Sequence, residues 1–217
     1  MNLGGRCFAG QKTLELRSSM ADQTDGGLAE SAASHLGGGA DPNQSVDAFC
    51  DLIVRQALPR ETEKVSDVLA EAARWLADRG QTMWRDNELL PESIAQDVEA
   101  GLFYVAAIEG QIVGVVKFQL EDLQFWPDSP AGHAAYVHRL AVRRKFAGRG
   151  VSTALLSWAV ERARALGRTY LRLDCEAART RLRAVYERFG FKHHSDREIG
   201  PYYVSRYEYT VRKETSS

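Results

Sequence analysis

The most constraining feature of this 217-residue chain is a strand, a helix and a second strand in succession between residues 135 and 174. Residues 135–142 are rich in β-forming side chains, and residues 170–174 form a second such run. Between them, residues 151–166 carry apolar side chains at three- and four-residue spacings, and Gly167 ends the periodic stretch. Strands joined by a helix pair in parallel within a layered α/β fold. We therefore expect a parallel strand pair around the middle of the sheet.

The segments on either side predict further helices and antiparallel strands. Residues 102–108 and 112–120 are β-rich and are separated by a short Gly-containing connection, which indicates an antiparallel hairpin. The remaining predicted elements are helices at 61–79, 91–101 and 178–189 and strands at 52–54, 191–195 and 204–209. The resulting order, βααββββαβαββ with the fourth strand left open, describes one α/β domain with a mixed sheet.

Composition excludes several classes of protein. A content of 44% hydrophobic and 26% charged residues is typical of a globular domain. The 28 Lys and Arg residues nearly balance 29 Asp and Glu residues, which argues against nucleic acid or an anionic membrane as a partner. No apolar run approaches the roughly 20 residues of a membrane span. Cys7, Cys50 and Cys175 lie too far apart for a zinc motif, so we expect no metal and a cytoplasmic location.

The N-terminal segment differs from the rest of the chain. Residues 1–45 hold eight of the 18 glycines and lack Val, Ile, Trp and Tyr, so they offer little apolar area to offset ordering entropy. We interpret residues 1–45 as a disordered tail and residues 46–217 as the folded domain. The sequence leaves open whether translation starts at Met1 or at Met20.

A basic, Gly-containing loop joins the central strand to the following helix. Five basic residues and no acidic one fall between Arg139 and Arg149, and the loop ends in Gly148-Arg149-Gly150. A helix start offers unpaired N–H groups and a positive dipole end, so it can bind a pyrophosphate. The alternative is a solvated loop in which the glycines only ease a turn. Nucleic-acid binding by this loop is disfavoured because no aromatic residues are interleaved with the basic ones.

Two common phosphate motifs do not fit this loop. A Walker A loop would need Gly-Lys followed by Ser or Thr, and no such sequence follows Gly148 or Gly150. A dinucleotide fingerprint would need a third glycine where Thr153 stands, and too few residues follow Gly148 to complete a doubly wound domain.

Two motifs together resemble the GNAT superfamily of acyl-CoA-dependent N-acetyltransferases. The first is Leu140-Ala141-Val142 followed by the stretch from Ala147 to Ser152, and the second runs from Tyr186 to Phe191. Ala147 stands where that family has Arg or Gln, Ser152 stands where it has Gly or Ala, and Arg179 stands where it often has Asn. The resemblance covers residues 50–209.

The resemblance implies a mixed, centrally splayed β-sheet flanked by helices, with acetyl-CoA as co-substrate and no metal. The strand at 136–142 would diverge from the strand at 170–174, which frees backbone groups for the pantetheine arm and the thioester. The pyrophosphate would lie on the loop and helix start. The cofactor-binding residues implied are Leu140, Ala141, Val142, Ala147, Gly148, Arg149, Gly150, Val151, Ser152 and Arg179, with electrostatic help from Arg143 and Arg144.

The reaction implied is direct attack of a primary amine on acetyl-CoA within a ternary complex. By motif position Tyr186 is the expected general acid, and His138 stands where many members of the family carry a Glu base. Glu121 and Asp122 are alternative bases, as is a water relay, and either His138 or Tyr186 could instead be a packing residue. The rival hypothesis is a non-catalytic CoA-binding or regulatory module of the same fold.

The acceptor is expected to be a small-molecule or protein amine. By resemblance, the loops bordering its cleft carry Trp84, Glu121, Trp126 and Tyr202. Aromatic and acidic side chains together suit a cationic amine with an apolar body. The sequence leaves the oligomeric state open, with a homodimer among the options.

Overall fold

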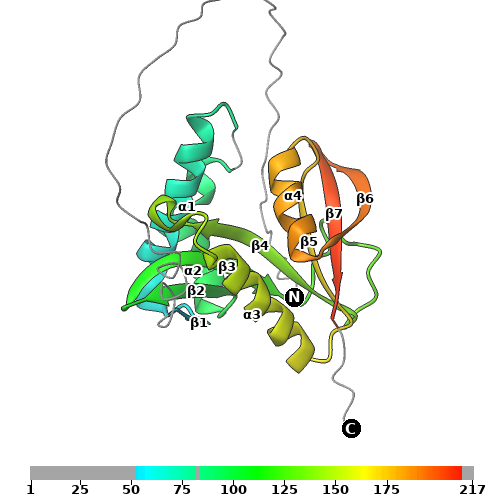
Figure 1. Ribbon diagram of the computed structural model, residues 1–217, viewed down its shortest axis with the longest axis horizontal. Helices are drawn as coiled ribbons and strands as arrows, with labels where there is room; N and C mark the ends of the chain where they lie inside the picture. Colours follow the sequence, from blue (N-terminus) through cyan, green and yellow to red (C-terminus); the bar gives the residue numbers. More distant parts are fainter. Residues whose placement is uncertain (1–51, 82–83, 212–217) are drawn as a thin grey trace, which may run out of the picture.

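Seven strands form one mixed sheet with the order β1-β2-β3-β4-β5-β7-β6 in the computed structural model, which describes residues 52–81 and 84–211 (Figure 1). The strands are β1 (Ile53–Gln56), β2 (Phe103–Ile108), β3 (Gln111–Gln119), β4 (Ala134–Val142), β5 (Tyr170–Glu176), β6 (Lys192–Ile199) and β7 (Tyr202–Thr210). The helices are α1 (Thr62–Ala77), α2 (Pro91–Glu99), α3 (Val151–Ala165) and α4 (Thr180–Phe189), with short 3-10 turns at Pro59–Glu61, Asp86–Glu88 and Arg144–Phe146.

This order confirms the single α/β domain and the mixed sheet that the sequence predicts. One detail differs, because residues 120–133 form turns between β3 and β4 and contain no strand. Pro127, Pro130 and Gly132 fall in this stretch, and proline cannot donate to a strand ladder. The open fourth strand is therefore absent, and a long loop takes its place.

The helices cover both faces of the sheet. The apolar stripes of α1 and α2, including Val65, Leu69 and Ile94, pack with Phe103 on one face. On the other face α3 packs with the central strands through residues such as Leu155. Figure 1 shows α1, in cyan-green, at the half of the sheet that contains β1–β3, and α4, in orange, beside β5 and β7. The core beneath α3 extends from β2 to β7, whereas the core of α1 and α2 ends at β4 with Ala141.

The central strands diverge as predicted. Parallel pairing of β4 with β5 is limited to Ala134–Tyr136 against Tyr170–Arg172, whereas β5 continues along β7 for its full length. From residue 137 onward, the edge of β4 that faces β5 has no ladder partner among the described strands. The sheet is therefore splayed at its middle, and the unpaired edge is available to a ligand.

A β-bulge shapes the same part of β4. Its register against β3 shifts between Val115 and Lys117, which pair with Ala141 and His138, so β4 holds one extra residue there. Arg139 within the bulge has a φ of +50°, a conformation that bulges accommodate and regular strands do not. The bulge re-aims the side chains of residues 138 and 139.

Some predictions lie outside the described residues. These are the tail at 1–45, the start of the domain at 46–51, Cys7, Cys50 and the choice between Met1 and Met20. Across residues 52–81 and 84–211, no helix combines the length and apolar character that crossing a bilayer requires. The cytoplasmic location stays a prediction.

Candidate active site

The start of α3 forms an open cradle of backbone N–H groups. Gly150 precedes the helix with a φ of +81°, and the first intrahelical hydrogen bond runs from Ala154 N to Gly150 O. The N–H groups of residues 151–153 are thus free of helical partners, and no acidic side chain lies in the first turn. Gly148 also has a positive φ of +75°, and a Cβ at either glycine would meet nothing within 4 Å. The glycines are needed for backbone conformation, and the space above them is open.

Helix α1 anchors the loop that leads to this cradle. Glu71 accepts hydrogen bonds from Arg143 Nη1 at 2.8 Å and from Arg144 N at 2.6 Å. The Arg144 guanidinium lies 3.7 Å from the ring centroid of Trp75. Arg143 and Arg144 therefore hold the loop against α1, and their electrostatic help to a phosphate stays a prediction. Glu71 carries no sequence signal that links it to this loop.

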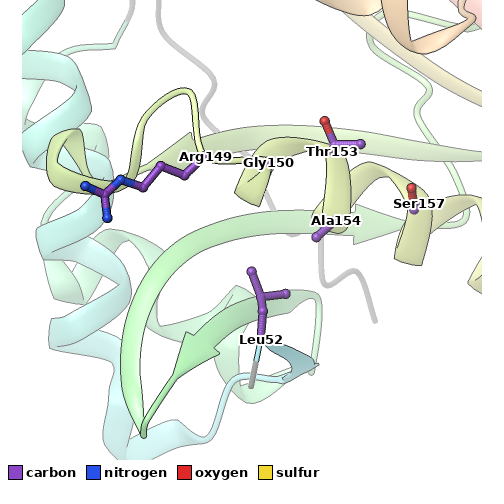
Figure 2. Close-up of a pocket in the computed structure, with 6 residues that line it drawn as sticks. All are labelled: Leu52, Arg149, Gly150, Thr153, Ala154 and Ser157. Carbon is purple, nitrogen blue, oxygen red and sulfur yellow. The ribbon is translucent and has the colours of Figure 1, made fainter. Parts of the chain in front are cut away.

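A pocket of about 440 Å³ adjoins the cradle, along the first two turns of α3. Figure 2 shows the Leu52 side chain directed toward Ala154 and the Arg149 side chain extending away from the helix. The residues that line the pocket are Leu52, Arg149, Gly150, Thr153, Ala154 and Ser157. No residue of β4 is among them, so the pocket extends the open space at the start of α3 and is separate from the groups in the splay.

Gly114 on β3 sets how closely α3 approaches the sheet. A Cβ at Gly114 would lie 2.9 Å from Val151 Cγ1 and 3.2 Å from the carbonyl oxygen of Ala141. These distances are below ordinary van der Waals contact. The absence of a side chain at Gly114 therefore lets the first turn of α3 sit directly on β3 and β4.

Three ionisable side chains meet in the splay. His138 on β4 lies between Asp122 of the β3–β4 loop and Asp174 of β5, with Nε2 at 3.3 Å from Asp122 Oδ2 and Nδ1 at 3.8 Å from Asp174 Oδ1. The three side chains are 20%, 4% and 11% exposed, respectively. These contacts have ion-pair distances but not hydrogen-bond alignment, and Nε2, Oδ2 and Oδ1 are buried without a hydrogen-bond partner in the described structure. Such unpaired buried atoms are costly unless a ligand or solvent completes them.

The pKa values of the Asp174 and Asp122 carboxyl groups are shifted in opposite directions. Burial raises the pKa of Asp174 to about 6, and the nearby charge of Asp122 adds to this, while His138 and Arg206 oppose it. For Asp122, burial also acts to raise the pKa, but it is outweighed by His138 and by backbone N–H groups such as that of Phe125, so the pKa is lowered. Asp174 can therefore exchange a proton near neutral pH, whereas Asp122 stays ionised.

The same three side chains have ligand atoms within 4.8 Å of one another, a spacing that could hold a divalent cation. Imidazole and carboxylate are also a suitable set for handling the protons of an amine. The expectation that no metal takes part stays a prediction.

Tyr186 and Cys175 lie beside Asp174 in the half of the sheet that contains β5 and α4. Tyr186 is 6% exposed and packs against Phe191 and Tyr207, with ring centroids 6.0 and 6.2 Å away. Burial, together with the charges of Cys175 and Asp174, raises the pKa of the Tyr186 phenol. Burial and Asp174 raise the pKa of the Cys175 thiol to about 12. Both groups stay protonated at neutral pH, so the Tyr186 phenol carries its proton and Cys175 is not a thiolate nucleophile.

Tyr202 lies near the splay cluster. Phe125 connects them, because its ring centroid is 6.4 Å from that of His138 and 6.3 Å from that of Tyr202. The Tyr202 hydroxyl is buried without a hydrogen-bond partner in the described structure. Trp84 is half-buried and packs on the core of α1 and α2, and the Glu121 side chain is exposed. Tyr202 is thus an acceptor-site candidate that shares a contact, the Phe125 ring, with His138.

Trp126 occupies a different position from the one we expected. Its side chain is 2% exposed and lies between the guanidinium groups of Arg172 and Arg206, each 4.5 Å from its ring centroid. Arg206 also pairs with Asp128 at 2.8 Å, within the same loop as Trp126. Trp126 therefore fastens the loop that carries Asp122 to β5 and β7, and it has too little exposed surface to contact an acceptor.

A second cluster adjoins the bulge, and sequence reasoning did not find it. Arg139 donates a hydrogen bond to the backbone oxygen of Glu88 at 3.2 Å, and burial lowers the Arg139 pKa. Glu88 Oε1 is buried without a hydrogen-bond partner in the described part of the chain, and burial raises the pKa of its carboxyl group. This cluster ties the segment between α1 and α2 to the end of β4 that faces the splay.

The other residues of the predicted cofactor site occupy two elements. The side chains of Leu140 and Val142 pack with the core beneath α3, and that of Ala141 packs with the core beneath α1. Because these side chains are used in packing, the backbone of the three residues is the part that faces the splay. Arg179 directly precedes α4, and its Nε donates to Glu176 Oε2 at 3.1 Å. Ala147 and Ser152 flank the cradle glycines, where backbone rather than side-chain groups are presented.

Comparison with known proteins points to one family. Residues 68–191 match the model of the acetyltransferase (GNAT) family. A Bacillus subtilis protein named uncharacterized N-acetyltransferase YesJ is 31% identical over 144 residues, which cover 63% of this chain and 79% of that protein.

Solved structures show the same fold. A GNAT-family acetyltransferase of Listeria monocytogenes has a TM-score of 0.58 at 24% identity, covering 73% of this chain and 95% of that one. The yncA protein of Salmonella typhimurium, solved with its cofactor acetyl-CoA, has a TM-score of 0.58 at 14% identity and covers 77% and 98%. The PaiA N-acetyltransferase of Thermoplasma acidophilum, in complex with coenzyme A, has a TM-score of 0.58 at 15% identity and covers 73% and 99%.

Proposed function

Because the chain belongs to the GNAT acetyltransferase family, we propose that it transfers the acetyl group of acetyl-CoA directly to a primary amine. One observation carries the proposal. The start of α3 at Gly150 is open and has no acidic residue in its first turn, and it follows β4, whose edge toward β5 is unpaired beyond Tyr136. A pyrophosphate on the cradle and a pantetheine arm along β4 would use these two features together. The acceptor is a small-molecule or protein amine.

The cofactor would be held mainly by backbone groups. The N–H groups of residues 151–153 and the flanking glycines would bind the pyrophosphate, and Arg149 is the exposed cation beside them. The unpaired edge of β4 near Leu140 and Val142 would supply N–H donors to the thioester oxygen. Donors of this kind, aimed at a developing oxyanion, contribute about 3–4 kcal/mol each.

His138 would act on the amine. An alkylammonium group with a pKa near 10 is mostly protonated at pH 7, so the nucleophile must lose a proton before it can attack. His138 is 20% exposed and its Nε2 lacks a hydrogen-bond partner in the described structure, so it can receive that proton. Asp122 beside it is ionised and would attract the ammonium group. Glu121 is less suitable because its side chain is exposed.

Tyr186 would protonate the departing sulfur. Its phenol is held in the protonated form by burial, and it lies in the half of the sheet across the splay from β4. One ammonium proton leaves through His138 to solvent, a second leaves the nitrogen as the C–N bond forms, and one proton reaches sulfur as the C–S bond breaks. The overall reaction releases one proton, so a weakly buffered pH assay can follow it.

The proposal is tested by binding and turnover measured separately. We expect acetyl-CoA, but not NAD or ATP, to raise the melting temperature, and we expect thiol release with at least one member of a panel of primary amines. Gly150→Glu should abolish the shift, because a carboxylate would occupy the pyrophosphate position. Glu198→Gln is the matched control, since it alters an exposed side chain of β6. Binding without turnover on any amine would instead support a non-catalytic CoA-binding module.

A further inference from the structure

We propose that Asp174 is a positioning residue for catalysis: it holds His138 with its proton on Nδ1, so that Nε2 and Asp122 Oδ2 form a two-acceptor clamp for the ammonium group of the acceptor. This inference rests on the proposed function. Asp174 was not among the site residues that the sequence indicated. It enters the site because β5 carries it to the place where β4 diverges.

The geometry assigns each ring nitrogen a different neighbour. Nδ1 is directed to Asp174 Oδ1 at 3.8 Å and Nε2 to Asp122 Oδ2 at 3.3 Å. A neutral imidazole carries one proton, and the partner of one nitrogen decides which nitrogen has it. The distance to Asp174 is longer than a hydrogen bond, as catalytic contacts often are before the substrate binds. Asp122 already accepts a hydrogen bond from the backbone N–H of Phe125, whereas Asp174 Oδ1 is buried without a hydrogen-bond partner in the part of the chain described. Nδ1–H is therefore the donor that Asp174 needs.

The other side of the ring then presents two acceptors. With the proton on Nδ1, Nε2 offers a lone pair next to Asp122 Oδ2, and both atoms are buried without a partner in the described residues. Two lone pairs 3.3 Å apart repel each other, but they suit two N–H groups of one ammonium ion. The two unpaired atoms, His138 Nε2 and Asp122 Oδ2, are thus explained as a binding site for the ammonium group of the acceptor.

Proton transfer follows from this arrangement. The ammonium ion gives one proton to Nε2, its nitrogen keeps the electron pair of the broken N–H bond, and that pair attacks the thioester carbon. The resulting imidazolium lies between two carboxylates, which stabilise its charge. Burial raises the pKa of Asp174, which keeps this support responsive to pH near neutrality. The charged groups that face Asp174 are Asp122 from the loop, His138 from β4 and Arg206 from β7, with the Cys175 thiol and Tyr186 phenol adjoining.

The first test is spectroscopic and needs no substitution at Asp174. In protein labelled with ¹⁵N-histidine, a long-range ¹H–¹⁵N spectrum at pH 7.5 reports which ring nitrogen carries the proton, and His138→Gln identifies the His138 signals. We expect protonation at Nδ1 of His138 in the wild-type protein and a shift toward Nε2 in Asp174→Asn, whose amide can donate to Nδ1. Protonation at Nε2 in the wild type would overturn the proposal. It would also be overturned by an unchanged tautomer in the variant.

The second test is kinetic. Asp174→Asn should lower kcat by about 10²–10⁴-fold and shift the pH dependence of kcat/KM between pH 5 and 7, while the affinity for acetyl-CoA changes less than about twofold. Asp122→Asn should mainly raise KM for the amine, because it removes a binding partner and leaves the tautomer unchanged. Glu198→Gln, a carboxylate-to-amide change on exposed β6, should match the wild type. A pH profile of Asp174→Asn that parallels the wild type would reject the positioning role.

Failure of the two proposals can be told apart. If acetyl-CoA does not bind and no amine is acetylated, the proposed function fails, and the tautomer measurement still reports on Asp174. If amines are acetylated but Asp174→Asn is fully active, the function stands and the role of Asp174 is refuted.

Discussion

Replacing Asp174 with Asn is expected to stabilise the folded protein at neutral pH even as it removes activity. The Asp174 carboxyl has a folded-state pKa of about 6, against an ordinary value of 3.8, and burial is the largest cause. A raised pKa means that the folded state binds the proton more tightly than the unfolded state does. Stability is therefore lost as pH rises from about 4 to about 6, because the carboxylate becomes charged in a buried site.

The magnitude follows from the same two values. A folded-state pKa near 6 and an ordinary value of 3.8 correspond to about 3 kcal/mol at 1.36 kcal/mol per pH unit. The Asn side chain has a similar shape and never ionises, so its cost does not change with pH. The free energy of unfolding of Asp174→Asn minus that of the wild type should thus be near zero at pH 4 and rise to about 3 kcal/mol at pH 7.5.

Urea unfolding at half-unit pH intervals, followed by tryptophan fluorescence, measures this difference. Subtracting wild type from variant cancels other titrating groups, such as Glu61, whose pKa is lowered to about 2 by its hydrogen bond with Arg55. Glu198→Gln should give a flat difference across the range. A flat curve for Asp174→Asn, or one that falls with pH, would refute the reasoning that Asp174 is ionised at a cost in the folded protein.

Four further substitutions test other parts of the structure. Gly150→Ala should lower the free energy of unfolding by about 1–2 kcal/mol in urea titrations, because φ at this residue is +81°, yet leave acetyl-CoA affinity measurable by calorimetry. Gly114→Ala should cost about 1–3 kcal/mol and also weaken acetyl-CoA binding, since its Cβ would push α3 away from β3; unchanged affinity would separate the two effects. Trp126→Ala should cost about 3–5 kcal/mol, and retention of wild-type stability would contradict its role between the two arginines. Tyr186→Phe should reduce kcat at least tenfold with unchanged acetyl-CoA affinity, and unaltered turnover would remove Tyr186 as the proton donor.

Local patterns were sufficient to predict most of the fold. Apolar spacing in residues 151–166 and the stop at Gly167 predict α3, which runs over Val151–Ala165, because a helix depends on neighbours three and four residues away. The stretch at 120–133 was harder, since its Pro and Gly residues allow a loop but do not specify its path. The splay was implied by a family resemblance, and the β4–β5 pairing ends after Tyr136 as that resemblance implies; cofactor binding at the start of α3 stays a prediction.

Fewer of the site residues than of the helices and strands could be predicted from the sequence. His138 could be proposed because it lies on the strand beside the motif, but its partners come from residues 16 positions before and 36 positions after it. No local signal distinguishes Asp174 from other polar strand residues. Trp126 looked like a binding residue because exposed loops often carry aromatic anchors, and only the positions of Arg172 and Arg206 reveal that it is enclosed. Long-range contacts of this kind depend on tertiary packing, which a single sequence does not display.

The short parallel pairing of β4 with β5, here called the seam, has a consequence for how the molecule unfolds. Three residue pairs join the half-sheet of β1–β4 to that of β5–β7, and the loop around Trp126 and the core beneath α3 also connect them. Each half has its own continuous ladder and forms one hydrogen-bonded unit, whose opening amide exchange reports. Acetyl-CoA lying across the seam would couple the two units. We expect amide hydrogen exchange in β5 and β7 to slow together with that in β3 and β4 when acetyl-CoA binds, although only β3 and β4 lie against the start of α3.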